Sequence, residues 1–281
     1  MLNALSVDVE DWFQVGAFEK VIARDAWDGL QSRVERNCEA VLALFERNGV
    51  KGTFFVLGWI AERYPELIRR IAQEGHEIAS HGWDHRRVST MTEDEFAADL
   101  QRASAAIEAA SGTAPRGYRA PSFSIDKRTP WAHRVLGAQG YLYSSSVAPI
   151  RHDHYGWPEA PRFAYQPLNN NELIELPVTT VTVGGKRLAA GGGGFFRLLP
   201  FAFSSWAIDR VNRRDERPAI FYFHPWEIDP DQPRVASAPL KSRLRHYSRL
   251  SAMAGKLDSL LKRHEWGRTD AVAEIERMRL Q

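Results

Sequence analysis

The stretch Lys51–Ser80, KGTFFVLGWIAERYPELIRRIAQEGHEIAS, decides the fold class. Within it, Thr53–Val56 predicts a buried strand, Ala61–Glu74 a helix closed by Gly75, and Glu77–Ser80 a second short strand. A strand, a helix and a strand in this order are typical of two parallel strands joined by a crossover helix. The unit therefore predicts a parallel sheet that is covered by helices.

The same alternation continues on both sides of this stretch. Further strands are expected at residues 3–9, 116–120, 141–147, 173–183 and 218–223, and helices at 33–48, 92–112, 127–138, 203–213, 240–264 and 269–279. Thr92 and Glu95 have the spacing of a capping box. Gly191–Gly194 is expected to form a loop bordering the site, and no Lys-Ser/Thr follows it as in a phosphate loop. An open doubly wound sheet and a closed barrel both fit this alternation.

Composition indicates a soluble globular protein of the size of one large α/β domain. The 281 residues are 44% hydrophobic and 26% charged, enough for a core that needs no stabilising metal. A bound metal would therefore serve chemistry. The near-zero net charge of +2 gives no reason to expect nucleic-acid binding. The only cysteine, Cys38, excludes an internal disulfide.

Several features bear on location. The N-terminus lacks a secretory signal, and the longest apolar run is too short to span a bilayer, so we expect a cytoplasmic protein without a transmembrane segment. Basic residues gather late, at Lys241–His246 and Lys262–His264. They are expected either to form a solvated helix face or to make a weak contact with an acidic membrane surface.

Two histidines four residues apart form the strongest local signal, in Ser80-His-Gly-Trp-Asp-His85. On a loop that leaves a strand, His81 and His85 can turn both imidazoles toward one cation. Nitrogen ligands of this kind suit zinc, cobalt or nickel. Chance spacing and a helix cap are the alternatives for the pair taken alone.

Three carboxylates end the first expected strand, in Val7-Asp-Val-Glu-Asp-Trp12. Such a cluster is unfavourable unless its members bind a cation or share a proton. Asp8 and Glu10 point to the same side of an extended chain, whereas Asp11 joins them only if the strand turns. Capping of a following helix is the alternative use of these side chains.

Two further side chains lie at expected strand ends. Arg119, followed by Ala-Pro-Ser122, can hold a carboxylate through two hydrogen bonds. His224 ends the apolar run Phe221-Tyr-Phe-His and is followed by Pro-Trp-Glu227. Because the C-terminal ends of parallel strands meet at one edge, Arg119 and His224 are expected to converge with the histidine pair and the acidic cluster.

In order and spacing, these motifs resemble those of the NodB-type polysaccharide deacetylases, a carbohydrate esterase family that removes N-acetyl groups from chitin-like, peptidoglycan and exopolysaccharide chains. The motifs are Leu5–Asp8, Ser80–His85, Arg119–Ser122 and Phe223–His224. The C-terminal part is similar to a branch associated with exopolysaccharide loci that accompany exosortase systems, in Gly192–Pro200, His224–Pro230, Gln232–Arg234 and Arg245–Leu250.

The resemblance implies a distorted (β/α) barrel of fewer than eight strands over residues 1–226, with residues 227–281 as a helical extension packed on it. It implies a polysaccharide N-deacetylase that depends on a divalent metal, zinc first and cobalt or nickel next. The expected substrate is an N-acetylated amino-sugar polymer or a lipid-linked oligosaccharide precursor in exopolysaccharide biosynthesis. A precursor at the inner membrane face is expected because the sequence shows no secretory signal.

The resemblance also implies roles for individual residues. Asp8 is the expected general base, Arg119 holds it, and His224 is the expected general acid. His81 and His85 bind the metal together with Glu10 or Asp11, a choice that the sequence leaves open. Apart from the resemblance, we expect the backbone N–H of Ser122 to stabilise the oxyanion. Trp12, Trp83 and Trp226 each lie inside a motif and are expected either to stack on sugar rings or to pack in the core.

Three departures from the family pattern stand out. Asp8-Val-Glu10-Asp11 replaces two adjacent aspartates, Ser122 stands where Tyr is common, and Ser144 stands where an Asp is common. If that Asp normally tunes the acid histidine, activity is reduced here. The departures motivate one alternative, a catalytically weak or inactive carbohydrate-binding protein on the same scaffold. A metal-dependent amidase of a small substrate is the other.

Overall fold

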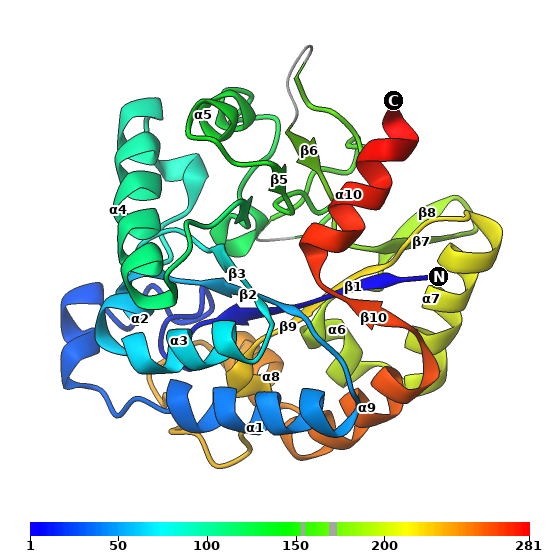
Figure 1. Ribbon diagram of the computed structural model, residues 1–281. Coiled ribbons are helices and arrows are strands. Elements are labelled where there is room, and N and C mark those ends of the chain that lie inside the picture. Colours follow the sequence, from blue (N-terminus) through cyan, green and yellow to red (C-terminus); the bar gives the residue numbers. More distant parts are fainter. Residues whose placement is uncertain (153–154, 169–172) are drawn as a thin grey trace.

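The computed structural model describes residues 1–152, 155–168 and 173–281. Eight parallel strands form one curled sheet in the order β10-β1-β2-β3-β4-β5-β6, with β9 on the other edge of β1, and β7 and β8 form a separate antiparallel pair (Figure 1). The strands are β1 (Asn3–Val9), β2 (Thr53–Val56), β3 (Glu77–Ser80), β4 (Gly117–Tyr118), β5 (Tyr143–Ser144), β6 (Ile174–Glu175), β7 (Thr180–Val183), β8 (Lys186–Ala189), β9 (Ile220–Phe223) and β10 (Trp266–Gly267).

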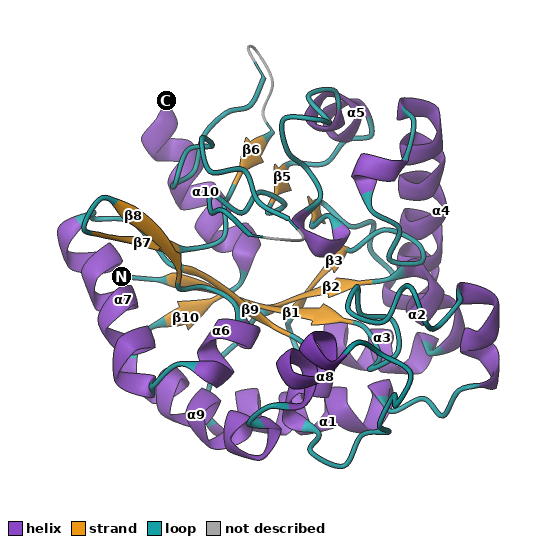
Figure 2. Ribbon diagram, turned by 180° about the vertical axis from the view of Figure 1, so that it is seen from behind, coloured by secondary structure: helices purple, strands orange, loops and turns teal. Residues whose placement is uncertain are grey.

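Helices surround the outside of this curled sheet (Figure 2). They are α1 (Val34–Arg47), α2 (Gly58–Arg63), α3 (Pro65–Gln73), α4 (Glu93–Ser111), α5 (Ala132–Ala138), α6 (Gly193–Leu198), α7 (Phe201–Arg214), α8 (Leu240–Tyr247), α9 (Leu250–Arg263) and α10 (Thr269–Leu280). The expected distorted (β/α) barrel is confirmed. The sheet has eight strands rather than fewer, because the two-residue β10 is added beside the start of β1.

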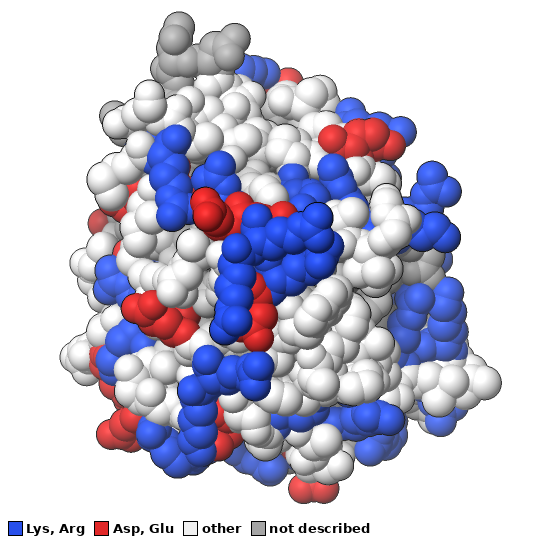
Figure 3. Space-filling view, turned by 90° about the vertical axis from the view of Figure 1, so that its right-hand side faces the viewer, with Lys and Arg blue, Asp and Glu red and all other residues white. Residues whose placement is uncertain are grey.

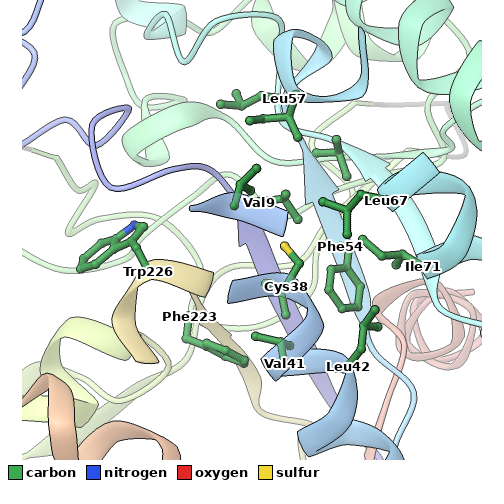
Figure 4. Packing of buried hydrophobic residues seen from close by; sticks show 14 of the residues in the cluster. Val9, Cys38, Val41, Leu42, Phe54, Leu57, Leu67, Ile71, Phe223 and Trp226 are labelled. Atoms are coloured by element: carbon green, nitrogen blue, oxygen red, sulfur yellow. The ribbon is translucent and has the colours of Figure 1, made fainter. Parts of the chain in front are cut away.

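The core lies between the sheet and the helices that cover it. Strand β1 is buried along its whole length, and α1 turns one apolar face toward it. Figure 4 shows Cys38 and Val41 of this face packed among Phe54 of β2 and Phe223 of β9. Burial raises the pKa of the Cys38 thiol far above its usual value. Cys38 therefore behaves as a small apolar core residue.

Most expected elements are present, and the differences have local causes. The capping box of Thr92 and Glu95 is confirmed at the start of α4. The expected helix 61–74 is two helices, since Pro65 begins α3 after a break at Tyr64. The expected strand 173–183 is divided into β6 and β7. The expected helix 240–264 is divided at Ser248 and Arg249 into α8 and α9.

The chain beyond residue 226 contributes to the barrel sheet through β10, whose Trp266 is in register with Asn3. The boundary expected at that residue stays a prediction. Within the described ranges, no helix combines the length and the apolar character needed to cross a bilayer.

One face of the molecule carries basic side chains with acidic ones among them (Figure 3). Some of the cations of α7 and α9 are paired: Asp209 lies within 4.0 Å of both Arg213 and Arg263. This mixture of signs fits the near-zero net charge.

Strand register places the expected functional residues at one edge. Asp8 is level with Phe55, and Ser80 is level with both Val56 and Tyr118. On the other side of β1, Val7 is level with Phe223. The loops that follow β1, β3, β4 and β9 therefore open at the same end of the barrel.

Candidate active site

The chain turns directly after β1. The backbone N–H of Glu10 donates to the carbonyl of Asp8 over 3.0 Å, so the extended conformation ends there. This turn sends the side chains of Glu10 and Asp11 to different surroundings. As a result, Glu10 lies beside the two histidines and Asp11 lies at the start of α1.

Glu10 joins the two histidines of the loop after β3. One ligand atom from each of Glu10, His81 and His85 lies within 4.8 Å of the other two, and all three residues are buried. Nδ1 of His81 is 2.8 Å from the carbonyl oxygen of Arg119, which can accept a hydrogen bond from Nδ1–H. The other ring nitrogen, Nε2, then keeps a lone pair that could bind a metal ion.

The electrostatics of this group fit a divalent cation. Oε2 of Glu10 is 2.9 Å from Nε2 of His85, yet this buried oxygen accepts no hydrogen bond of normal geometry within the described chain. A metal ion held by both atoms would satisfy this buried oxygen. Burial lowers the pKa of His81 to about 4, so its imidazole is neutral, as a ligand must be. For Glu10, burial is outweighed by the charges of His85 and His224, and its pKa falls to about 2.

Asp11, the alternative ligand, lies apart from this group and caps a helix. Its Oδ2 accepts from the hydroxyl of Ser32 (2.6 Å) and from the backbone N–H groups of Arg33 (2.8 Å) and Val34 (3.2 Å), at the start of α1. Its Oδ1 accepts from the N–H of Trp12. Burial raises the pKa of Asp11 in spite of these bonds. Of the two carboxylates between which the sequence left the choice open, Glu10 lies with the two histidines and Asp11 caps α1.

Asp8 and Arg119 form a buried pair beside Glu10, His81 and His85. Nη1 of Arg119 donates to Oδ1 of Asp8 over 2.6 Å and to the hydroxyl of Ser6 over 2.8 Å. Nε and Nη2 of Arg119 donate to the carbonyl and the hydroxyl of Ser145. Arg119 is fully buried, so four hydrogen bonds fix its position and, through it, that of Asp8.

His224 follows β9 and reaches the same group from the other side. Its Nε2 is 3.2 Å from Oε1 of Glu10, and its Nδ1 is 2.8 Å from Oε1 of Glu227. Burial opposes the charged imidazolium, but the two carboxylates outweigh burial and raise the pKa of His224 to about 9. Trp226 stacks on the His224 ring at an interplanar angle of 20°.

A cavity of about 670 Å³ opens over these side chains. The expected residues among its lining are Asp8, Glu10, His81, His85, Ser122, His224 and Trp226. Ser122 has a left-handed backbone (φ 55°), which breaks the regular course of the chain at the cavity wall.

Trp83, expected to stack on a sugar, does not line this cavity. Its ring is covered by the guanidinium of Arg102, 3.5 Å from the ring centre, and the ring packs against Gly58. Trp12 is likewise a core residue, and its indole N–H donates to the carbonyl of Gln31. Of the three motif tryptophans, only Trp226 borders the cavity.

Sequence reasoning missed several polar partners. It gave no role to Ser6, Ser145, Arg197 or Glu227, although Glu227 stands three residues after His224. That spacing is a capping-box signal, and the structure shows this box at the start of the 3-10 helix Pro225–Ile228. Gly191–Gly194 is only partly a loop, because Gly193 already begins α6.

Two sequence families match consecutive parts of the chain. Residues 25–141 match the family described as polysaccharide deacetylase, and residues 145–274 match a domain of unknown function, DUF3473. Among curated proteins, a peptidoglycan-N-acetylglucosamine deacetylase of Bacillus cereus is 33% identical over 93 residues, which are 33% of this chain and 34% of that protein. The chain thus spans about a third of the length of this relative.

Solved structures share the fold over nearly the whole chain. The crystal structure of a candidate polysaccharide deacetylase from Mycobacterium smegmatis superposes with a TM-score of 0.64 at 22% identity, covering 99% of this chain and 91% of that one. The PuuE allantoinase superposes with a TM-score of 0.59 at 15% identity, covering 96% and 88%. At these identities the superpositions establish the fold alone.

Proposed function

We propose that the chain belongs to the polysaccharide deacetylase family, whose pattern residues 25–141 match, and that it is a metal-dependent hydrolase that removes N-acetyl groups from an amino-sugar polysaccharide or its oligosaccharide precursor. One observation carries the proposal. Glu10, His81 and His85 converge beside the Asp8–Arg119 pair and His224 in one cavity.

Glu10, His81 and His85 would hold a divalent cation, and we propose zinc, for which two imidazoles and one carboxylate are a known catalytic ligand set. When bound, such a cation supplies Lewis-acid polarisation of the acetyl carbonyl and a more acidic water. Cobalt and nickel suit the same donor atoms.

The protein's own side chains would divide the proton transfers. Asp8, fixed by Arg119, takes a proton from the attacking water. His224 gives a proton from Nε2 to the nitrogen of the leaving amino sugar, because its Nδ1 is occupied by Glu227. We propose that the backbone N–H of Ser122, at the cavity wall, stabilises the developing oxyanion. Acetate and a free amine result.

The cavity supports a saccharide substrate over a small amide. Its volume of about 670 Å³ lies well inside the range of pockets that enclose drug-sized ligands. Aromatic side chains, among them Phe123, Tyr155, Phe195 and Trp226, line it. Such faces stack on sugar rings.

The proposal predicts that zinc-loaded protein releases acetate from N-acetylglucosamine oligomers and produces free amino groups in equal amount. Both products should disappear when the metal is removed by a chelator and return when zinc is restored. Oligomer binding without acetate release would contradict the proposal in favour of a carbohydrate-binding protein. Hydrolysis confined to small cyclic amides would contradict it in favour of an amidase.

We also propose that the enzyme works at an acidic membrane surface, on a lipid-linked precursor. Leu240 and Leu244, one turn apart on α8, are 68% and 59% exposed, and Lys241 and Arg243 are exposed beside them. The same helix borders the cavity through Ser242 and Arg245. Exposed leucines among cations are typical of helices that lie on anionic bilayers. Roles in exopolysaccharide biosynthesis and in the cytoplasm stay predictions.

We therefore expect the protein to sediment with vesicles containing phosphatidylglycerol and much less with pure phosphatidylcholine. The double variant Leu240→Ser, Leu244→Ser should lose this binding, because it removes the apolar part of the contact. Met278→Ser is the matched control, since Met278 is 61% exposed on α10. Equal sedimentation of both variants would contradict a role for α8.

A further inference from the structure

His224 is the first member of a buried chain of charged groups. Its Nδ1 is 2.8 Å from Oε1 of Glu227, and Oε2 of Glu227 accepts from Nε of Arg197 over 2.6 Å. Glu227 and Arg197 are 0% and 2% exposed. Each carboxylate oxygen of Glu227 thus has its own charged or ionisable partner, so the carboxylate cannot turn without losing both.

Arg197 is itself held by the end of α8. Its Nη1 donates to the carbonyl oxygens of His246 (3.2 Å) and Ser248 (2.5 Å), and its Nη2 donates to that of Arg245 (3.2 Å). These carbonyls are the kind of group that a helix C-terminus leaves for a cation. The position of Glu227 is therefore fixed by α6 and α8, two elements of the segment that matches DUF3473.

The glycine run before α6 makes room for this carboxylate. A Cβ atom on Gly193 would lie 2.2 Å from Oε1 of Glu227, which no side chain tolerates. Gly193 thus permits the close approach of α6 to the carboxylate. This packing gives a physical reason for a glycine in a place where the sequence suggested only a flexible loop.

Ser144, by contrast, brings no carboxylate to the site. It is fully buried, and its hydroxyl donates to that of Ser146 over 2.8 Å. The acidic group that the family pattern places at this position is therefore missing from β5. The side chain that does contact Nδ1 of His224 is Glu227, which lies three residues after His224 itself.

We infer that Glu227, locked by Arg197, is the positioning residue for His224 and takes over the function that an aspartate at position 144 would have had. This inference rests on the proposed function and names a residue that acts through His224 rather than on the substrate. Glu227 accepts a hydrogen bond from Nδ1–H of His224 and so keeps Nε2 directed at the leaving nitrogen. The segment that matches DUF3473 thereby supplies both the proposed acid, His224, and the residue that positions it.

The substitution Glu227→Gln should reverse the polarity of this hydrogen bond. Nε of Arg197 donates to Oε2 of Glu227, and the backbone N–H of His224 donates to Oε1, and neither group can accept. Because the hydrogen bond from the charged guanidinium is the stronger of the two, the amide oxygen would stay on Arg197. The amide NH₂ would then face the backbone N–H and Nδ1 of His224, and Nδ1 would have to accept. His224 could no longer carry a proton on Nδ1 and another on Nε2, so it would be a poor proton donor.

The test compares two substrates of the zinc-loaded full chain. An N-acetylglucosamine oligomer has an amine leaving group that needs a proton, whereas the phenolate of 4-nitrophenyl acetate leaves without one. We expect Glu227→Gln to lower kcat on the oligomer by about 10²-fold with little change in KM, and to lower the rate on the ester far less. Arg197→Lys should show the same pattern as Glu227→Gln, with a larger loss of rate on the oligomer than on the ester.

A second readout does not depend on turnover. In ¹H–¹⁵N NMR, the Nδ1 proton of His224 should be protected from exchange in the wild type and absent in Glu227→Gln. The matched control is Glu276→Gln. Glu276 is a buried carboxylate on α10, away from the cavity, and it is paired with Arg217 and Arg279. It should leave the Nδ1 proton and the ratio of the two rates unchanged.

The outcomes separate the inference from the function on which it rests. A wild type that hydrolyses neither substrate would overturn the proposed function, while the NMR signal would still show whether Glu227 holds the proton. An active wild type with equal losses on both substrates and an unchanged Nδ1 signal would overturn the inference. Glu227 would then only maintain the fold.

Discussion

Replacing Glu10 with Gln or His81 with Ala is expected to abolish both zinc binding and acetate release. Each variant leaves two of the three proposed ligands, and among the described residues the group of ligand atoms within 4.8 Å of one another has no fourth member. Zinc content after dialysis, measured by atomic absorption, and acetate release from N-acetylglucosamine oligomers report the two losses separately. His85→Ala should behave in the same way.

Asp11→Asn is the matched control for Glu10→Gln, because the two carboxylates are neighbours in the sequence. It should keep its zinc and its activity while losing stability, since Asp11 caps α1 through Arg33 and Val34. Loss of a cap of this kind costs about 1 kcal/mol. Full activity of Glu10→Gln or His81→Ala in metal-free buffer restored with zinc would refute the metal site. Zinc loss in Asp11→Asn would reassign the third ligand.

Asp8→Asn should lower kcat by about 10²–10⁴-fold while zinc remains bound. The amide can still accept a hydrogen bond from Arg119, so the pair keeps its geometry, but it cannot take a proton from water. Single-turnover acetate release and zinc content measure the two properties. Unimpaired turnover would exclude Asp8 as the base.

Ser6→Ala provides the control for this prediction. Ser6 contacts the same Nη1 of Arg119 as Asp8 does, but it carries no acidic group. Its removal should cost about 1 kcal/mol of stability, with a far smaller effect on kcat than that of Asp8→Asn. A loss of kcat as large as that of Asp8→Asn would mean that the effect comes from displacement of Arg119.

Much of this site was predictable because strand ends are visible in the sequence. Asp8, His81, Arg119 and His224 each follow an apolar run, and parallel strands bring such ends to one edge. The split between Glu10 and Asp11 was not predictable. It depends on the start of α1, whose backbone N–H groups take up Asp11 from more than twenty positions along the chain.

The parts that sequence reasoning missed are short or depend on distant contacts. Strand β10 has two residues, too few to show any alternation. Trp83 lies in a motif and was expected to stack on a sugar ring, but Arg102 of α4 covers its ring. The sequence predicted no role for Glu227, and its contact with Arg197 depends on the approach of α6. In each case the deciding partner lies far away in the chain.

The double pairing of β1 also sets the order in which the protein acquires its site. One edge of β1 pairs with β2, beginning at Thr53, and the other pairs with β9, which begins only at Ile220. Contacts between residues so far apart form slowly, because closing the intervening chain costs entropy before the contacts stabilise it. The residues proposed as metal ligands, Glu10, His81 and His85, lie in the first third of the chain, whereas His224 and Glu227 lie in the last third. The proposed site is therefore complete only when β9 has paired with β1.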